Sequence, residues 1–218
     1  MREALRGRRR VHHIWTTHPQ DWPGAGAATA EEITARAGSD GHQGVCAEVD
    51  PYPYASGEDL LAAPNPLIVA LDEVTDPQNL GAVARTAEAV GATGIVIPER
   101  RSAEVTAAVA KASAGAVEHL AIARVRNLAD FLADAKDASC WCYGAAADAR
   151  TAYTTVDWSG GVVLVLGAEG KGLRPRVAAA CDDLVSLPLR GRVESLNVSA
   201  TAAVLLYAIL QYRLDTST

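Results

Sequence analysis

From residue 67 onward, short apolar runs alternate with segments of helical pattern, and this alternation constrains the fold more than any other feature of the chain. Apolar runs of this length, bounded by turn residues, are typical of strands buried on both faces of a sheet. Strands that alternate with helices predict a parallel sheet covered by helices on both faces. Ligands bind such sheets at the carboxyl ends of the strands. We expect strands at 67–71, 94–97, 120–125, 140–144, 161–167 and 184–189, and helices at 79–92, 102–113, 127–137, 174–182 and 195–213.

The first part of the chain has a different pattern. Residues 1–50 contain two expected strands, "VHHIWTT" and "GVCAEVD", and one short helix, "AEEITARAG". Residues 51–66 carry four prolines, which is typical of a linker. We therefore expect a small α/β module at 1–50, a linker at 51–66 and a larger α/β domain at 67–218. An apolar content of 49% is sufficient for a full core.

Composition and charge narrow the classes of protein. No stretch of 18 apolar residues is present, so we expect no transmembrane helix. The charged start "MREALRGRRR" has no apolar signal core after it, which indicates a cytoplasmic protein. A net charge of −6 argues against a protein that coats nucleic acid indiscriminately.

A local basic site is still compatible with that charge. Five arginines lie in residues 1–10, and arginine pairs recur along the chain. The pairs are either solvated surface or, because they fall near the ends of expected elements, the lining of one cleft. They are Arg100/Arg101, Arg124/Arg126, Arg174/Arg176 and Arg190/Arg192.

The four cysteines do not indicate a metal site. Cys140 and Cys142 are spaced C-x-C in an expected strand, which puts both on one face. Neither they nor Cys46 and Cys181 have a neighbouring cluster of His or Cys in the sequence. We expect buried, inert thiols and no bound metal.

The stretch "VVLVLGAEGKGL" (162–173) delivers a glycine-rich loop from the end of an expected strand. It fails the P-loop pattern because Gly172 follows Lys171, and its G-x-x-G-x-G order fails the dinucleotide pattern. Glu169 at its centre would repel a phosphate. The residues alone leave two interpretations of Glu169. It caps backbone amides in a tight turn, or it binds a cation or a set of hydrogen-bond donors.

Two other stretches carry polar residues at expected helix starts. In "NLGAVARTAEAVGA" (79–92), Asn79 is typical of a cap or turn, and Arg85 lies among small residues where it can reach a partner or pair with Glu88. In "LPLRGRVESLNVSATAAVLLY" (187–207), Ser195, Asn197 and Ser199 lie close together. A cap needs only one of the three, which favours a lined pocket.

Together these stretches resemble the three signature motifs of the SpoU/TrmH family of RNA ribose 2′-O-methyltransferases, in the SPOUT superfamily. The resemblance covers about residues 66 to 213, with the three motifs in order. The stretches "RRSAEVTAAVAKASAGAVEHL" and "HQGV" most resemble the branch of this family that methylates guanosine of 23S ribosomal RNA. The resemblance implies a parallel SPOUT domain with a C-terminal trefoil knot and a homodimer. It also implies that residues 1–50 are an abbreviated form of the family's L30e-like RNA-binding module.

The resemblance further implies the site. S-adenosylmethionine would be the cofactor, and a side chain at Gly167 would crowd it. The catalytic residues would be Arg85, Asn79, Glu169, Ser195 and Asn197, and the cofactor-binding residues would be Gly167, Leu187, Leu196, Gly144, Leu166 and Leu189.

A ribose hydroxyl ionises poorly at neutral pH, so the reaction needs a proton acceptor or stabilisation of the developing alkoxide. A guanidinium is normally never deprotonated, so we expect a charged Arg85 that binds the adjacent phosphate. Asn79 would position Arg85 or the ribose, and Glu169 would orient donors around the loop. Ser195 and Asn197 would bind phosphate, cofactor or Arg85.

Three other functions stay open. Two belong to the same family, a tRNA ribose methyltransferase and a ribosomal RNA methyltransferase that confers antibiotic resistance. The third is a non-catalytic RNA-binding or ribosome-assembly module. The joint presence of all five catalytic candidates argues against the third, because a binding-only descendant would be expected to have lost one of them. The failed glycine pattern excludes a dehydrogenase.

Overall fold

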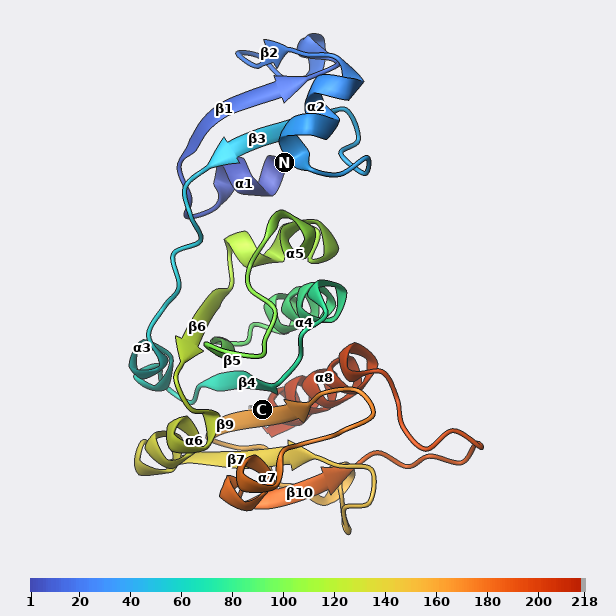
Figure 1. The fold of residues 1–218 in the computed structure, drawn as a ribbon. Coiled ribbons are helices and arrows are strands. Elements are labelled where there is room, and N and C mark those ends of the chain that lie inside the picture. Colours follow the sequence, from blue (N-terminus) through green and yellow to red (C-terminus); the bar gives the residue numbers. More distant parts are fainter. Residues whose placement is uncertain (217–218) are drawn as a thin grey trace. The chain divides into compact units, whose positions relative to one another are not determined.

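The computed structural model describes residues 1–216, and the chain divides into two compact units, Met1–Pro53 and Tyr54–Thr218 (Figure 1). The first unit holds a three-stranded sheet in the order β2-β1-β3. Strand β1 pairs parallel with β2 and antiparallel with β3. Its elements are α1 (Arg2–Arg6), β1 (Val11–Thr16), a 3-10 turn (Pro19–Asp21), β2 (Gly26–Ala27), α2 (Ala30–Ala37) and β3 (Val45–Val49).

Helix α2 begins where the sequence provides a capping box. The Thr29 hydroxyl accepts the backbone N–H of Glu32, and the Glu32 carboxylate accepts that of Thr29. Two of the free amides at the helix start are thereby satisfied. Ile33 on this helix is fully buried in the first unit.

The second unit is a seven-stranded sheet in the order β6-β5-β4-β9-β7-β10-β8, and every strand pair in it is parallel. The predicted parallel α/β domain is thus confirmed. Its strands are β4 (Leu67–Asp72), β5 (Gly94–Pro98), β6 (Ala121–Val125), β7 (Cys140–Ala145), β8 (Thr151–Ala152), β9 (Gly161–Gly167) and β10 (Asp183–Ser186). Its helices are α3 (Gly57–Leu61), α4 (Pro77–Ala89), α5 (Ala107–Ala112), α6 (Leu128–Asp137), α7 (Pro175–Ala180) and α8 (Val198–Thr216), with 3-10 turns at Ala116–Glu118 and Tyr153–Thr155.

Helices cover both faces of this sheet. Helices α3, α6 and α7 contribute Leu60, Leu132 and Val177 to one cluster with inward-facing strand residues such as Ile68 and Val163. Helix α4 packs against α5 and α8 elsewhere in the domain, as Figure 1 shows. All six residues of β4 are buried, which explains why the central strands appear in the sequence as unbroken apolar runs.

Several boundaries differ from the predicted ones, and helix caps and a proline explain most of the differences. Helix α4 begins at Pro77 rather than 79, because the Asp76 carboxylate accepts the N–H of Gln78 at 2.9 Å and proline suits the first turn. Helix α5 begins at Ala107 rather than 102, because Thr106 caps it. Strand β10 ends at Ser186 rather than 189, before Pro188, which has no N–H to donate to a ladder. Helix α8 begins at Val198 rather than 195.

The segment 51–66, in which prolines predict a linker, contains a helix. Ser56 accepts the backbone N–H of Asp59 at 3.0 Å and so caps α3. Leu60 of this helix is 3% exposed and lies in the core of the second unit. Among residues 1–216, no helix is both long and apolar enough to cross a membrane.

Candidate active site

A cavity of about 400 Å³ lies at the carboxyl ends of β7, β9 and β10. Its wall comes from the loops that follow these strands and from the segment that leads into α8. The lining residues are Ala145, Ala146, Ala147, Leu166, Gly167, Ala168, Glu169, Gly170, Lys171, Gly172, Val185, Leu187, Leu189, Glu194, Ser195, Leu196, Val198 and Thr201. The cavity is within the size range of small-molecule sites, and it lies where ligands bind parallel sheets.

Five of the six residues expected to bind a cofactor line this cavity, namely Leu166, Gly167, Leu187, Leu189 and Leu196. Gly144 does not. A Cβ atom at Gly144 would come within 2.7 Å of side-chain atoms of Leu184 and Leu173, so this glycine serves close packing beneath the cavity. The next three residues along the chain, 145–147, form the wall instead.

A second cavity, of about 380 Å³, adjoins the first. It lies between the end of β4, the start of α4 and the loop after β5. Its lining residues are Glu73, Val74, Thr75, Asp76, Asn79, Arg101, Ala168, Glu169, Lys171 and Val198. Four of these residues, 168, 169, 171 and 198, also line the first cavity. The glycine loop is therefore the wall that both cavities share.

The three motifs meet at this wall. Asn79 donates a hydrogen bond from Nδ2 to Glu169 Oε1 at 2.9 Å, and Asn197 Nδ2 donates to the same oxygen. Asn197 Nδ2 also donates to Asn79 Oδ1 at 3.0 Å. The carboxylate thus accepts two side-chain amides from segments 90 and 28 residues away in sequence. Glu169 thus binds a set of side-chain donors, as one of the two interpretations of the sequence expects, and the interpretation as a cap of backbone amides is wrong.

Two of these side chains, those of Asn79 and Asn197, are positioned by the starts of helices α4 and α8. Asn79 lies in the first turn of α4, which Asp76 caps, so the Asn79 side chain is free to reach Glu169. Asn197 directly precedes α8, and its Oδ1 accepts the backbone N–H of Ser199 at 2.8 Å. Its Oδ1 therefore caps the helix while its Nδ2 binds Glu169, so one residue serves both roles.

The glycine loop closes tightly on itself. Gly170 and Gly172 have φ values of +73° and +64°, the left-handed region that favours glycine. A Cβ atom at Gly167 would lie 2.2 Å from the backbone carbon of Gly172. The expectation that a side chain at Gly167 would first crowd the cofactor needs correction, because it would first collide with the loop's own backbone.

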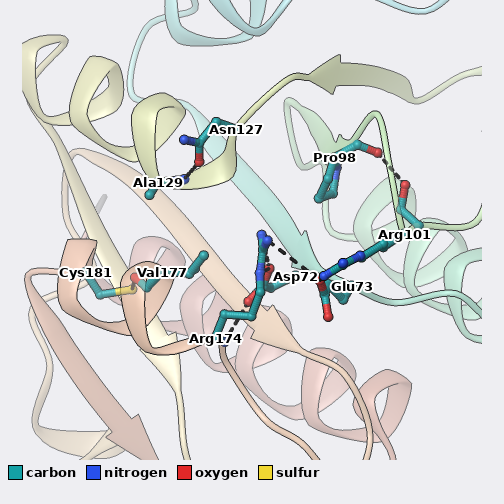
Figure 2. Close-up of polar contacts among 10 residues, drawn as sticks. Asp72, Glu73, Pro98, Arg101, Asn127, Ala129, Arg174, Val177 and Cys181 are labelled. Carbon is teal, nitrogen blue, oxygen red and sulfur yellow. Dashed lines mark hydrogen bonds and ion pairs between the residues drawn. The ribbon is translucent and has the colours of Figure 1, made fainter.

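An ion pair with a buried carboxylate anchors the far end of this loop. Asp72, the last residue of β4, is fully buried and accepts the backbone N–H of Arg174 at 2.8 Å and its guanidinium at 2.7 Å. Figure 2 shows this pair next to Glu73 and Arg101. The hydrogen bond to Asp72 is the main cause that raises the pKa of Arg174. Because Asp72 pairs with Gly167 across the sheet, the loop is held at both ends.

Arg85 lies apart from this network. It is exposed on α4, lines neither cavity and forms no ion pair with Glu88 within residues 1–216. Ser195 lines the first cavity from the segment before α8. The structure therefore brings Asn79, Glu169 and Asn197 into one network, adds Ser195 to the cavity wall, and leaves Arg85 on the surface.

The arginine pairs do not line one cleft. Arg101 reaches the second cavity, and Arg174 is bound to Asp72. Arg124 pairs with Glu104 at 3.1 Å and Arg176 with Asp130 at 2.9 Å, both away from the two cavities.

The thiols fit the expected inert role in the larger unit. Cys140 and Cys142 are both buried, and all four cysteines are free. Burial raises the pKa of Cys142 and of Cys181 to about 12. Cys46 and Cys181 are partly exposed, so the prediction that all four thiols are buried is wrong for these two. Residues 1–216 contain no group of three or more His, Cys, Asp or Glu that could hold a metal ion.

Comparison with known proteins identifies the family. Residues 66–207 match the SpoU rRNA Methylase family. The chain belongs to this family. The predicted SpoU/TrmH family of RNA methyltransferases is thereby confirmed.

Individual relatives agree with the SpoU assignment. The chain is 46% identical over 177 residues to the "Putative TrmH family tRNA/rRNA methyltransferase YacO" of Bacillus subtilis, covering 79% of this chain and 71% of that protein. It is 44% identical to an uncharacterized tRNA/rRNA methyltransferase of Synechocystis, covering 79% of this chain and 46% of that protein. The chain therefore spans about half the length of the second relative.

Among solved structures, an AdoMet-bound rRNA methyltransferase from Sinorhizobium meliloti superposes with a TM-score of 0.83 at 26% identity. The match covers 96% of this chain and 83% of that one. The same SPOUT-type architecture is thus present in both proteins.

Sequence reasoning missed several residues of this SpoU site. Asp72 and Glu73 follow the apolar run of β4, and carboxylates at the end of a buried strand are a signal that was available. Arg101 and Arg174 were noted only as members of arginine pairs. Their partners lie 28 and 102 residues away, so no local pattern indicates them.

Proposed function

We propose that this RNA methyltransferase transfers a methyl group from S-adenosylmethionine to a ribose 2′-hydroxyl, and that its substrate is a guanosine of 23S ribosomal RNA. The observation that carries the proposal is the network of Glu169, Asn79 and Asn197 at the wall between two adjoining cavities. A group-transfer reaction needs two ligands in contact. Two cavities that share one polar wall meet that need.

The first cavity suits S-adenosylmethionine, which supplies a methyl group activated on a sulfonium. Its leucines at 166, 187, 189 and 196 offer apolar contact, and the glycine loop offers backbone groups to a ligand. Glu169 places a negative charge on the wall, which suits a cationic ligand. In the S. meliloti protein, AdoMet is the bound ligand.

The second cavity suits the reacting nucleotide. Asn79 and Glu169 both line it, and amide and carboxylate groups are hydrogen-bonding partners for ribose hydroxyls. We assign to this pair the positioning of the 2′-hydroxyl toward the first cavity. The amides of Asn79 and Asn197 hold Glu169 in place, so the site needs little rearrangement when the nucleotide binds.

We assign to Arg85 the stabilisation of the alkoxide and the binding of the adjacent phosphate. We further propose that the protein is a homodimer in which Arg85 of one subunit acts in the site of the other. Arg85 is exposed and lines neither cavity of its own chain. Helix α8, against which α4 packs, exposes Val204, Tyr207 and Leu214 at 42%, 54% and 58%. Large apolar side chains on the exposed side of a helix are typical of a subunit interface. A second copy of the chain would bring its Arg85 to the site.

Three further features belong to the same proposal. The first unit is assigned the binding of RNA, which its arginines at 2, 6, 8, 9 and 10 support. The C-terminal trefoil knot, which the family resemblance implies, and the cytoplasmic location stay predictions.

The test is methyl transfer from labelled S-adenosylmethionine to purified 23S ribosomal RNA and to transfer RNA, followed by nucleoside analysis. We expect label in 2′-O-methylguanosine from 23S RNA. Label in transfer RNA alone would favour the tRNA enzyme, which the "tRNA/rRNA" description of the B. subtilis relative also allows. Label on a base would refute the ribose assignment, and RNA binding with no transfer would favour a non-catalytic module.

A further inference from the structure

A chain of ion pairs runs along one wall of the second cavity. Glu73 lies between two guanidinium groups, 3.2 Å from that of Arg101 and 3.7 Å from that of Arg174 (Figure 2). Arg174 is bound more closely to the buried Asp72, at 2.7 Å. Glu73 and Arg101 line the cavity, whereas Arg174 and Asp72 do not. The inner pair therefore supports an outer pair that faces the cavity.

The backbone at both outer residues has an unusual conformation. Glu73 has φ +58° and Arg101 has φ +59°, a region that residues other than glycine seldom adopt. Such conformations persist only where the surrounding structure imposes them, and they occur often at ligand sites. A hydrogen bond of 2.9 Å from Ala103 N to Val74 O joins the two loops beside these residues. The fold thus holds both side chains at the cavity despite an unfavourable backbone.

The two members of the outer pair differ in exposure. The side chain of Arg101 is 77% exposed, and that of Glu73 is 18% exposed. An exposed ion pair contributes little free energy, so Arg101 can exchange its partner readily. Glu73 keeps Arg174 as a second partner if Arg101 moves. Arg101 is therefore already positioned at the cavity and can bind another anion in place of Glu73.

We propose that Arg101 binds a backbone phosphate of the RNA beside the reacting nucleotide, exchanging Glu73 for that phosphate. The inference rests on the proposed function, because Asn79 and Glu169 in the same cavity would hold the ribose. Each ribose in RNA has a phosphate on either side, so a phosphate lies within one nucleotide of any bound ribose. A guanidinium fork matches phosphate oxygens in a bidentate manner. Lys171 in the same lining adds a second positive charge.

The test compares Arg101→Ala with Arg100→Ala in the full-length protein. Arg100 is the adjacent arginine, is exposed and lines neither cavity, so it is a matched control for loss of one charge. RNA affinity is measured over a range of salt concentrations with a fragment of the RNA that the wild-type protein methylates, or with total ribosomal RNA if none is methylated.

Loss of one phosphate contact on single-stranded RNA should make the slope of log K against log salt less steep by about 0.7. We expect this change, with a roughly tenfold loss of affinity, for Arg101→Ala and not for Arg100→Ala. The KM for RNA should rise more than kcat falls, the affinity for S-adenosylmethionine should stay unchanged, and Arg101→Lys should recover part of the binding.

A second variant distinguishes loss of the phosphate contact from a folding defect. Arg101→Gly removes the guanidinium and accepts φ +59° without strain, so it should fold as the wild type does and show the same altered salt slope. The inference is wrong if Arg101→Ala and Arg101→Gly bind RNA with the slope of Arg100→Ala while the wild type methylates RNA. A wild type that methylates no RNA would overturn the proposed function instead, and the salt slopes would still decide whether Arg101 contacts phosphate.

Discussion

Replacement of Gly167 by alanine tests how the glycine loop shapes the cofactor cavity. The added Cβ would lie 2.2 Å from Gly172 C, 2.3 Å from Gly172 O and 2.5 Å from Leu173 N. These are backbone atoms, so they must move by about 1 Å to restore an ordinary van der Waals contact of 3.4 Å. The loop cannot move freely at its far end, because Arg174 is bound to the buried Asp72.

The displacement should weaken both binding and folding. Overpacking of this kind costs about 1–3 kcal/mol in the free energy of unfolding. The moved segment lines the first cavity, so we expect the Kd for S-adenosylmethionine to rise at least tenfold, or about 1.4 kcal/mol in the free energy of binding. Isothermal titration calorimetry measures the Kd for S-adenosylmethionine, and denaturant unfolding measures the free energy of unfolding.

Gly191→Ala is the control, because a Cβ atom there would meet nothing within 4 Å and Gly191 does not line either cavity. It should bind S-adenosylmethionine as the wild type does. The reasoning is refuted if Gly167→Ala binds within a factor of two of the wild type, or if Gly191→Ala loses as much affinity as Gly167→Ala.

Three further predictions concern the surface arginine, the buried anchor and the thiols. Arg85→Ala should slow methyl transfer by about 10²-fold or more and leave cofactor affinity unchanged, as rate and calorimetry would show; lost cofactor binding with surviving turnover would contradict this. Asp72→Asn should lower the free energy of unfolding by about 2 kcal/mol, since Asp72 is fully buried and its partner Arg174 is partly exposed; an unchanged denaturation midpoint would show that the pair contributes nothing. Cys142 and Cys181, with a pKa of about 12, have a thiolate fraction of about 10⁻⁴ at pH 8 and should react with a thiol reagent only on unfolding. Rapid modification of Cys142 or Cys181 in the native protein, mapped by mass spectrometry, would refute their inertness.

The sheet was predictable because its central strands are buried on both faces. Strand β9 spans the predicted residues 161–167, and β4 extends the predicted run by one residue, Asp72. Helix starts were less predictable, since several residues near each start can serve as the cap. Thr106 rather than Ser102 precedes the α5 helix, and nothing local distinguishes them.

The site was predictable in its members and not in its geometry. Asn79, Glu169 and Asn197 were expected from the family resemblance, whereas the residues alone were compatible with ordinary caps. Their hydrogen bonds join segments up to 118 residues apart, which only the fold can show. The pair of Glu73 and Arg101 was missed because positive φ values at these residues have no signature in the sequence.

The most direct test of the central claim is a map of 2′-O-methylated nucleotides in ribosomal and transfer RNA from cells with and without this protein. Complementation compares the wild type with Asn79→Ala, which removes one amide from Glu169. We predict that one guanosine of 23S RNA loses its ribose methyl group without the protein, and that only the wild type restores it fully. An unchanged map, or the loss of a base methyl group instead, would contradict the account.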